Sequence, residues 1–195
     1  MQYLLGLTGS IGMGKSTTAA MFRDEGIPVW DADAAVHRLY SPNGAAVPLF
    51  AAQFPEVVVK GAVSREALNK LISANPAVLK NIEQIVHPLV AEDRKVFAAE
   101  NPDKIILFDM PLLFEIGADT WMDAVVVVSC PKDVQRDRVL ARPSMTEAQF
   151  ELILSKQLPD ANKRMMADHV IETASLDATR EAVQKLIINL REQHG

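Results

Sequence analysis

The sequence contains very little cysteine and no long apolar run. The single thiol, Cys130, cannot form an intramolecular disulfide, and no zinc or haem spacing surrounds it, so we expect it to be buried and inert in a reducing compartment. The longest apolar run in a strand-like segment, 124–128, is far below the roughly 18 residues that span a bilayer. Residues 1–7 lack the basic region of a signal peptide. We therefore expect a cytoplasmic protein without a membrane partner.

An excess of positive charge is also missing. The chain of 195 residues has 20 Lys and Arg against 25 Asp and Glu, a net charge of −5. Polyanion-binding surfaces are usually basic, so we expect no nucleic-acid partner. The segment 132–164 is the exception, with seven Lys or Arg, five Asp or Glu and a net charge of +2. This suits a lid that closes over phosphates, although a merely solvated helix face is the alternative.

Short runs of Val, Ile and Leu alternate with longer stretches of helical period, which predicts the α/β class with parallel strands. A helix is predicted over 14–25, ended by Gly26. Two gaps between strands, 32–103 and 132–167, are mostly helical and much longer than a crossover requires. We expect one sheet core that carries two helical insertions. The predicted strands are 3–8, 27–30, 104–108, 124–129 and 169–171.

A phosphate-binding motif follows the first predicted strand. Residues 9–16, GSIGMGKS, match the Walker A pattern G-x-x-x-x-G-K-[ST] directly before a predicted helix. Glycines let backbone N–H groups turn inward around an anion, Lys15 adds a point charge near the β and γ phosphates, and Ser16 offers a hydroxyl to Mg²⁺. The motif predicts a nucleotide phosphate site.

The strand 104–108 ends in a carboxylate, Asp109, suited to hold Mg²⁺ or a substrate hydroxyl; a strand-end or capping carboxylate is the alternative. Met110 stands where many ATPases carry a glutamate that activates water, and the chain has no N-K-x-D motif for guanine. These absences favour a kinase over a GTPase switch or an ATPase.

Further candidates lie outside the motif. Asp31 and Asp33 follow the second strand, where one of them is placed to accept a proton from an attacking hydroxyl, or simply to cap the next helix. Arg138 and Arg142 are expected one turn apart on a helix face. His87 either contacts substrate or packs in the interior; the four histidines have no metal-ligand spacing.

Several segments together resemble the dephospho-CoA kinase family, nearly end to end. The most specific are Asp31-Ala-Asp33 and the run D-M-P-L-L-F-E over 109–115. The other matching residues are Leu7–Gly12 with Gly14, Lys15 and Ser16, His87-Pro88-Leu89, Pro131, Gln135, Arg138, Arg142, Gln157, Ala167 and Asp168. Where the family usually has Asn after the last strand, this chain has Thr173.

The resemblance implies an enzyme that uses ATP and Mg²⁺ to phosphorylate the ribose 3′-hydroxyl of dephospho-CoA, the last step of coenzyme A biosynthesis. It implies a P-loop kinase fold of three α/β/α layers with a five-stranded parallel sheet. A single domain, 1–195, is divided into a core (1–31, 104–131 and 168–195), a helical CoA-binding insertion (32–103) and a helical lid (132–167). A monomer is favoured.

The resemblance also implies roles for single residues. Asp33 is the expected general base, with Lys15 and Arg142 as further catalytic residues. Acceptor binding falls to Asp33, His87 and Asp109, and metal binding to Ser16 and Asp109. Met13 is expected to contribute only its backbone. The expected ATP-binding residues are Gly9, Gly12, Met13, Gly14, Lys15, Ser16, Thr17, Arg138 and Arg142.

Two other functions stay open from the residues alone. One is another small-molecule P-loop kinase, of nucleoside monophosphate or shikimate type. The other is a nucleotide-binding switch without catalysis, against which the missing guanine motif counts.

Overall fold

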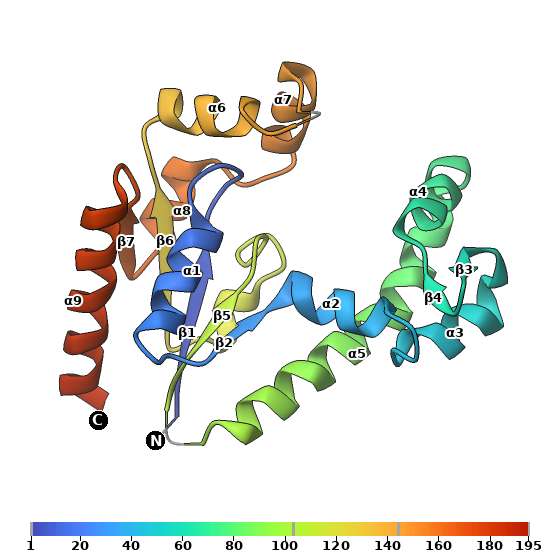
Figure 1. Ribbon diagram of the computed structural model, residues 1–195, viewed down its shortest axis with the longest axis horizontal. Coiled ribbons are helices and arrows are strands. Elements are labelled where there is room, and N and C mark those ends of the chain that lie inside the picture. Colours follow the sequence, from blue (N-terminus) through green and yellow to red (C-terminus); the bar gives the residue numbers. More distant parts are fainter. Residues whose placement is uncertain (1, 103, 144, 195) are drawn as a thin grey trace. The chain divides into compact units, whose positions relative to one another are not determined.

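The computed structural model describes residues 2–102, 104–143 and 145–194. The chain forms two compact units, one made of residues 1–30 and 101–195 and the other of residues 31–100. Figure 1 labels the helices and strands of both units.

The first unit is built on a parallel sheet. Its strand order, β2-β5-β1-β6-β7, places the first strand at the centre. In register, Leu5 of β1 lies opposite Leu107 of β5 and Ala124 of β6. The five-stranded parallel α/β prediction is confirmed, with strand ends shifted by at most two residues. The strands are β1 (Tyr3–Thr8), β2 (Val29–Asp31), β5 (Ile105–Asp109), β6 (Ala124–Ser129) and β7 (His169–Glu172).

Helices α1 (Lys15–Asp24) and α9 (Leu176–His194) share one apolar core with the sheet. Phe22 of α1 and Val183 of α9 are fully buried against side chains such as Leu7 and Val126. Gly26, with φ +78, follows α1 as predicted, because only glycine adopts this conformation without strain. The core therefore fixes the end of β1 against the start of α1.

Three helices fill the long segment between β6 and β7, as the helical pattern predicted: α6 (Lys132–Leu140), α7 (Glu147–Ser155) and α8 (Asp160–Met166). The expectation that Arg138 and Arg142 share a helix face is wrong, because α6 ends at Leu140 and Arg142 lies in the following bend. Arg142 precedes Pro143, and a residue before proline is disfavoured in the helical region.

The second unit is mainly helical. Its core includes Phe50, Val57, Leu68, Ile82 and Ile85. Its elements are α2 (Ala32–Tyr40), α3 (Ala46–Gln53), the 3₁₀ turns η1 (Pro55–Val57) and η2 (Pro76–Val78), strands β3 (Val58–Val59) and β4 (Ala62–Val63), α4 (Arg65–Ala74) and α5 (Leu79–Glu100). A further 3₁₀ turn, η3 (Ala118–Trp121), belongs to the first unit.

The small hairpin of β3 and β4 was not predicted. Its strands have two residues each, too few for any alternation of apolar and polar side chains to show. Lys60 and Gly61 both have positive φ, 51° and 77°, as the two central residues of a type I′ turn do. In the sequence, Gly61 between the pairs Val58–Val59 and Ala62–Val63 was the available signal for this hairpin.

A buried ion pair joins the loop after β5 to α8 in the first unit. Lys163 is fully buried, and its Nζ lies 2.9 Å from Glu115 Oε1, which also accepts a 2.8 Å hydrogen bond from the Leu158 amide. Burial acts to raise the pKa of Glu115, but the bonds from Lys163 and Leu158 outweigh it and hold this pKa below its ordinary value of 4.5. Ionised Glu115 therefore stabilises the fold.

We predict that Glu115→Gln lowers the free energy of unfolding by about 3 kcal/mol at pH 7, because it leaves the Lys163 ammonium buried without a carboxylate. The pair contributes fully above pH 4.5 and is lost as the pH falls through the lowered pKa, so the difference from the parent should shrink in acid. Urea unfolding at several pH values measures both effects.

The control replaces both partners, Glu115→Leu with Lys163→Met, and should recover most of the loss because no charge stays buried. A loss below about 1 kcal/mol in Glu115→Gln, the size of an exposed pair, would contradict the prediction.

Candidate nucleotide site

The loop between β1 and α1, residues 9–14, forms the centre of the site. Gly12 and Gly14 have φ of 79° and 89°, in the left-handed region that side chains disfavour. A side chain at Gly12 would also meet Val139 Cγ2 at 2.5 Å and the Gln135 carbonyl oxygen at 3.0 Å. Backbone conformation therefore favours glycine at both positions, and at Gly12, which the Walker A pattern leaves unspecified, the close approach of α6 also excludes a side chain.

The loop leads into the start of α1, where amide groups are available for an anion. The first helical bond runs from the Thr18 amide to the Gly14 carbonyl, 3.0 Å away. The amides of Lys15, Ser16 and Thr17 precede that bond and, like the first N–H groups of any helix, have no intrahelical acceptor. Ser16 and Thr17 are exposed. This end of α1 suits a phosphate group.

Lys15 and Asp109 meet at the carboxyl ends of neighbouring strands. Lys15 Nζ donates to Asp109 Oδ1 over 2.5 Å, and Asp109 is 2% exposed at the end of β5. The segment after Asp109 is a turn and not a helix, so the alternative of a helix cap is wrong. The buried Asp109 carboxylate holds the Lys15 ammonium, so one negative and one positive group lie side by side next to the loop.

Two glutamines from the segment between β6 and β7 hold the loop. Gln135 of α6, 5% exposed, donates from Nε2 to the Ile11 carbonyl at 2.7 Å. The Ile11 amide in turn donates to Gln157 Oε1 at 3.1 Å. Both glutamines belong to the family resemblance, but nothing in the sequence predicts a role for them. Their partner lies 124 and 146 residues away along the chain, so no local signal connects them.

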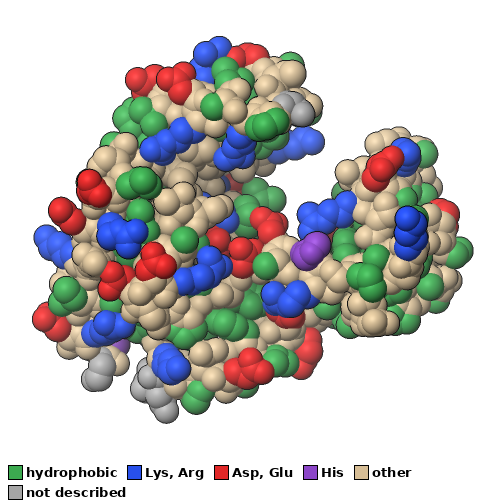
Figure 2. Space-filling model, viewed as in Figure 1, with side chains coloured by type: hydrophobic (Ala, Val, Ile, Leu, Met, Phe, Trp, Pro, Cys, Tyr) green, Lys and Arg blue, Asp and Glu red, His purple; other side chains and the backbone are tan. Residues whose placement is uncertain are grey.

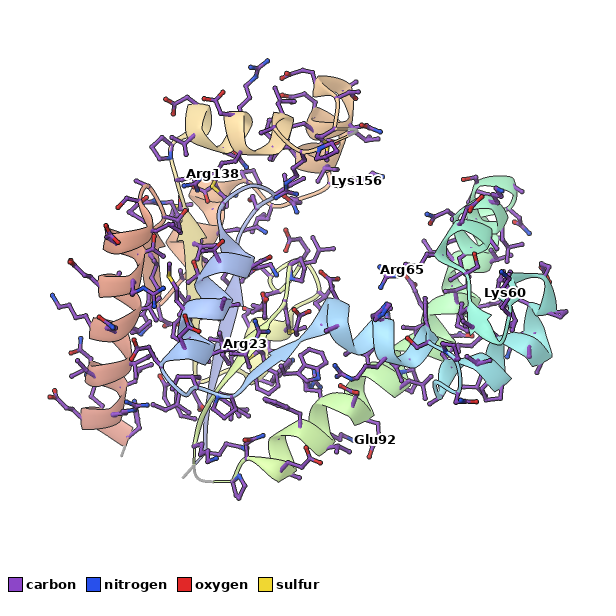
Figure 3. All side chains as sticks on the ribbon, in the orientation of Figure 1. Arg23, Lys60, Arg65, Glu92, Arg138 and Lys156 are labelled. Carbon is purple, nitrogen blue, oxygen red and sulfur yellow. The ribbon has the colours of Figure 1, made fainter. Side chains whose placement is uncertain are left out.

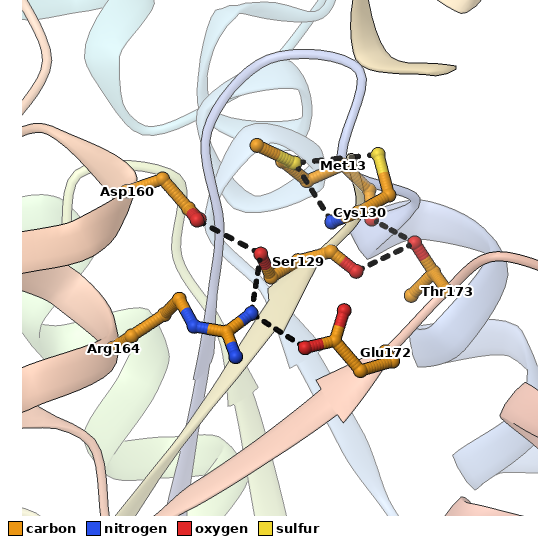
Figure 4. Close-up of polar contacts among 7 residues, drawn as sticks. All are labelled: Met13, Ser129, Cys130, Asp160, Arg164, Glu172 and Thr173. Atoms are coloured by element: carbon orange, nitrogen blue, oxygen red, sulfur yellow. Dashed lines mark hydrogen bonds and ion pairs between the residues drawn. The ribbon is translucent and has the colours of Figure 1, made fainter. Parts of the chain in front are cut away.

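Met13 anchors the loop by its side chain, which corrects the expectation that only its backbone matters. The side chain is 2% exposed, and its sulfur accepts a hydrogen bond of 3.2 Å from the Cys130 amide (Figure 4). The Met13 amide donates to the Ser10 carbonyl at 3.1 Å within the loop. Cys130 is buried as expected, and burial raises the pKa of its thiol, which keeps it protonated.

The predicted arginines differ in their surroundings. Arg138 lies beneath α6, beside the loop (Figure 3), and donates to Thr173 Oγ1 at 3.2 Å and to the Thr173 carbonyl at 2.6 Å. Arg142 is exposed beyond the end of α6. Arg136 forms an exposed ion pair with Glu147 of α7, as a solvated helix face would. In Figure 2, Lys and Arg side chains line the lower edge of the part formed by α6 and α7.

A cavity of about 820 Å³ separates α6 and α7 from α8 and the end of β6. Its lining includes Met13, Cys130, Gln135, Phe150 and Asp160. The underside of α6 and α7 is thus only partly packed.

Asp31, Asp33 and His87 lie in the second unit. Asp31 Oδ1 accepts a 2.9 Å hydrogen bond from the Ala34 amide and is the N-cap of α2, so the capping alternative is correct for Asp31. Asp33 is exposed in the first turn of α2, and the cap does not use it. His87 is exposed on α5, so it is not a packing histidine. Acceptor roles for Asp33 and His87 stay predictions.

The residues expected to hold Mg²⁺ supply hard oxygen atoms, from the Ser16 hydroxyl and the Asp109 carboxylate, and these are the ligands that Mg²⁺ prefers. Among the described residues, no three His, Cys, Asp or Glu side chains gather into a metal site. A small protein contribution fits Mg²⁺, which usually keeps several waters and binds substrate phosphates.

Comparison with known proteins identifies a family to which nearly the whole chain is similar. Residues 3–178 match the family model described as dephospho-CoA kinase. A dephospho-CoA kinase from Cereibacter sphaeroides is 55% identical over 190 residues, covering 97% of this chain and 96% of that protein. A solved protein from Thermus thermophilus has a TM-score of 0.85 at 31% identity, covering 96% and 97% of the two chains. A dephospho-CoA kinase from Campylobacter jejuni, 24% identical with full coverage of both chains and a TM-score of 0.71, shares the fold.

We predict that Asp31→Ala lowers the free energy of unfolding by about 1 kcal/mol, because it removes the N-cap of α2. Asp33→Ala should cost no more than about 0.5 kcal/mol, the size of a first-turn dipole interaction. Urea unfolding of the two variants measures the difference. Equal losses would contradict the division of roles between these two carboxylates.

Proposed function

This chain belongs to the dephospho-CoA kinase family, and on that premise we propose that it transfers the γ-phosphoryl group of ATP to the ribose 3′-hydroxyl of dephospho-CoA, forming coenzyme A. The observation that carries the proposal is the family match over residues 3–178. The nucleotide site supports it, because the loop, Lys15 and Asp109 supply the parts that a P-loop kinase needs.

On the ATP side, the amides at the start of α1 and the Lys15 ammonium hold the phosphates. As the γ-phosphoryl group leaves, negative charge spreads over its oxygens, and fixed positive groups lower the barrier because they need no reorganisation. Arg138 and Arg142 add positive charge when the lid segment 132–167 closes, which also excludes water that would compete as an acceptor. When bound by Ser16 and Asp109, Mg²⁺ neutralises the phosphate charge.

On the acceptor side, Asp33 accepts the proton of the attacking hydroxyl. The division of roles with Asp31 supports this assignment, because the carboxylate of Asp31 is engaged in capping whereas Asp33 is exposed. His87 and Asp109 contact the acceptor, and the helical segment 32–103 binds the CoA part. In the proposed division of the chain into a core, a CoA-binding insertion and a lid, the core consists of residues 1–31, 104–131 and 168–195.

We further propose that the enzyme works as a monomer in the cytoplasm. The protonated, buried thiol of Cys130 is consistent with a reducing compartment. No helix in the described ranges is both long and apolar enough to cross a membrane.

The function is tested by measuring ADP release with ATP and a panel of acceptors: dephospho-CoA, AMP, CMP, UMP and shikimate. We expect turnover with dephospho-CoA to exceed that with every other acceptor by at least about 100-fold, because a site that pairs the acceptor's polar groups rejects analogues lacking them. Preference for a nucleoside monophosphate or shikimate would overturn the assignment. Tight nucleotide binding without acceptor-dependent turnover would indicate a switch.

We predict that Asp33→Asn lowers kcat by about 100-fold or more, since it removes the proton acceptor, and changes the KM for ATP less than about twofold. Asp31→Asn is the matched control, because asparagine also caps helices, and it should keep near-normal kcat. Steady-state kinetics with both substrates varied gives these values. Near-normal turnover in Asp33→Asn would remove Asp33 from the role of base.

A further inference from the structure

Thr173 is the first residue after β7, and its side chain lies against the nucleotide loop. It is 4% exposed, and a Cβ added at Gly14 would lie 3.1 Å from its Oγ1. Oγ1 lies 2.7 Å from the Met13 carbonyl oxygen, 3.3 Å from the Ser129 carbonyl oxygen and 3.2 Å from Arg138 Nη1 (Figure 4 shows the two carbonyl contacts). This one hydroxyl thus contacts three elements: the loop, the last residue of β6, and helix α6.

The direction of these hydrogen bonds follows from the chemistry of a hydroxyl. A threonine hydroxyl has one proton to donate and lone pairs to accept with, and the arginine can only donate. The distance of 2.7 Å to the Met13 carbonyl is that of a good bond, whereas 3.3 Å to the Ser129 carbonyl is long. The proton therefore goes to Met13, and Arg138 donates to Thr173.

The bond to the Met13 carbonyl has a consequence for the next amide. In a trans peptide the C=O and the following N–H point in opposite directions. When Thr173 holds the Met13 carbonyl outward, the Gly14 N–H is directed away from Thr173. Gly14, at positive φ, is the residue on the far side of this peptide, and its lack of a side chain leaves the peptide freer to rotate. A side chain from outside the loop is therefore needed to fix its orientation.

Thr173 also fixes the arginine. Arg138 Nη2 donates to the Thr173 carbonyl at 2.6 Å while Nη1 reaches Oγ1, so the guanidinium has two contacts with one residue. We infer that Thr173 is a positioning residue for ATP, orienting the Gly14 amide and the Arg138 guanidinium together toward the nucleotide phosphates. This inference rests on the proposed use of ATP by the same loop.

The test compares Thr173→Val, which keeps the shape and removes the hydroxyl, with Thr173→Ser, which keeps the hydroxyl. We expect Thr173→Val to raise both the KM for ATP and the Kd for ADP about tenfold, because the Met13 carbonyl loses its donor and Arg138 loses one of its two contacts with residue 173. Thr173→Ser should stay within about twofold of the parent. The KM for dephospho-CoA should not change in either variant.

Thr179→Val is the matched control for losing a buried threonine hydroxyl. Thr179 is 3% exposed, and its Oγ1 donates to the Ser175 carbonyl at 2.6 Å in the first turn of α9. It should lower the melting temperature as Thr173→Val does and leave the KM for ATP unchanged. If Thr173→Val does not fold, Thr173→Ala takes its place against Thr173→Ser.

Three results would overturn the inference: an unchanged KM for ATP in the variant without the hydroxyl, equal effects of the valine and serine variants, or an equal rise in the KM for dephospho-CoA. Calorimetric titration with ADP needs no acceptor. It therefore tests Thr173 even if the parent protein fails to phosphorylate dephospho-CoA, so the two failures are distinguishable.

Discussion

The site depends on one constraint: a short loop must hold its backbone N–H groups inward around an anion. Such a loop has few contacts of its own, and two of its residues, Gly12 and Gly14, adopt conformations that glycine reaches at a cost in entropy. Something outside the loop must therefore hold it. Here the holding groups are polar side chains and a buried sulfur from segments far along the chain.

Each of these groups binds a different atom of the loop. Gln135 and Gln157 bind the two polar groups of Ile11, Cys130 binds the Met13 sulfur, and Thr173 binds the Met13 carbonyl. Because buried polar groups are expensive to leave unpaired, these bonds favour one loop conformation over its alternatives. The helical segment between β6 and β7, which supplies both glutamines, is thereby coupled to the loop, so a movement of α6 would disturb the loop backbone.

The buried charges of the first unit follow the same rule, because each buried charged group needs a partner. Asp109 pairs with Lys15 and Glu115 pairs with Lys163, and both carboxylates stand in the run 109–115, which begins at the last residue of β5. One pair lies beside the glycine-containing loop. The other ties the same run to α8, next to the lid. The acidic net charge of the whole chain therefore does not describe the charge at this site. The local charge there is set by individual ion pairs and by the net +2 of segment 132–164.

The sequence by itself determined the sheet strands, the loop motif, Lys15, Asp109 and the helical character of both long insertions, because apolar periodicity and Gly-x-x-x-x-Gly-Lys spacing are local signals. From the residues alone it left Asp31 and Asp33 equivalent, and only the family resemblance singled out Asp33 as a base. It also placed Arg142 on a helix and gave no role to Gln135, Gln157 or the Met13 side chain. The structure decided which carboxylate caps α2 and where α6 ends, because the local pattern allowed either outcome. It also decided the contacts of the glutamines and of Met13, because hydrogen bonds between residues 117 to 160 positions apart leave no trace in local pattern.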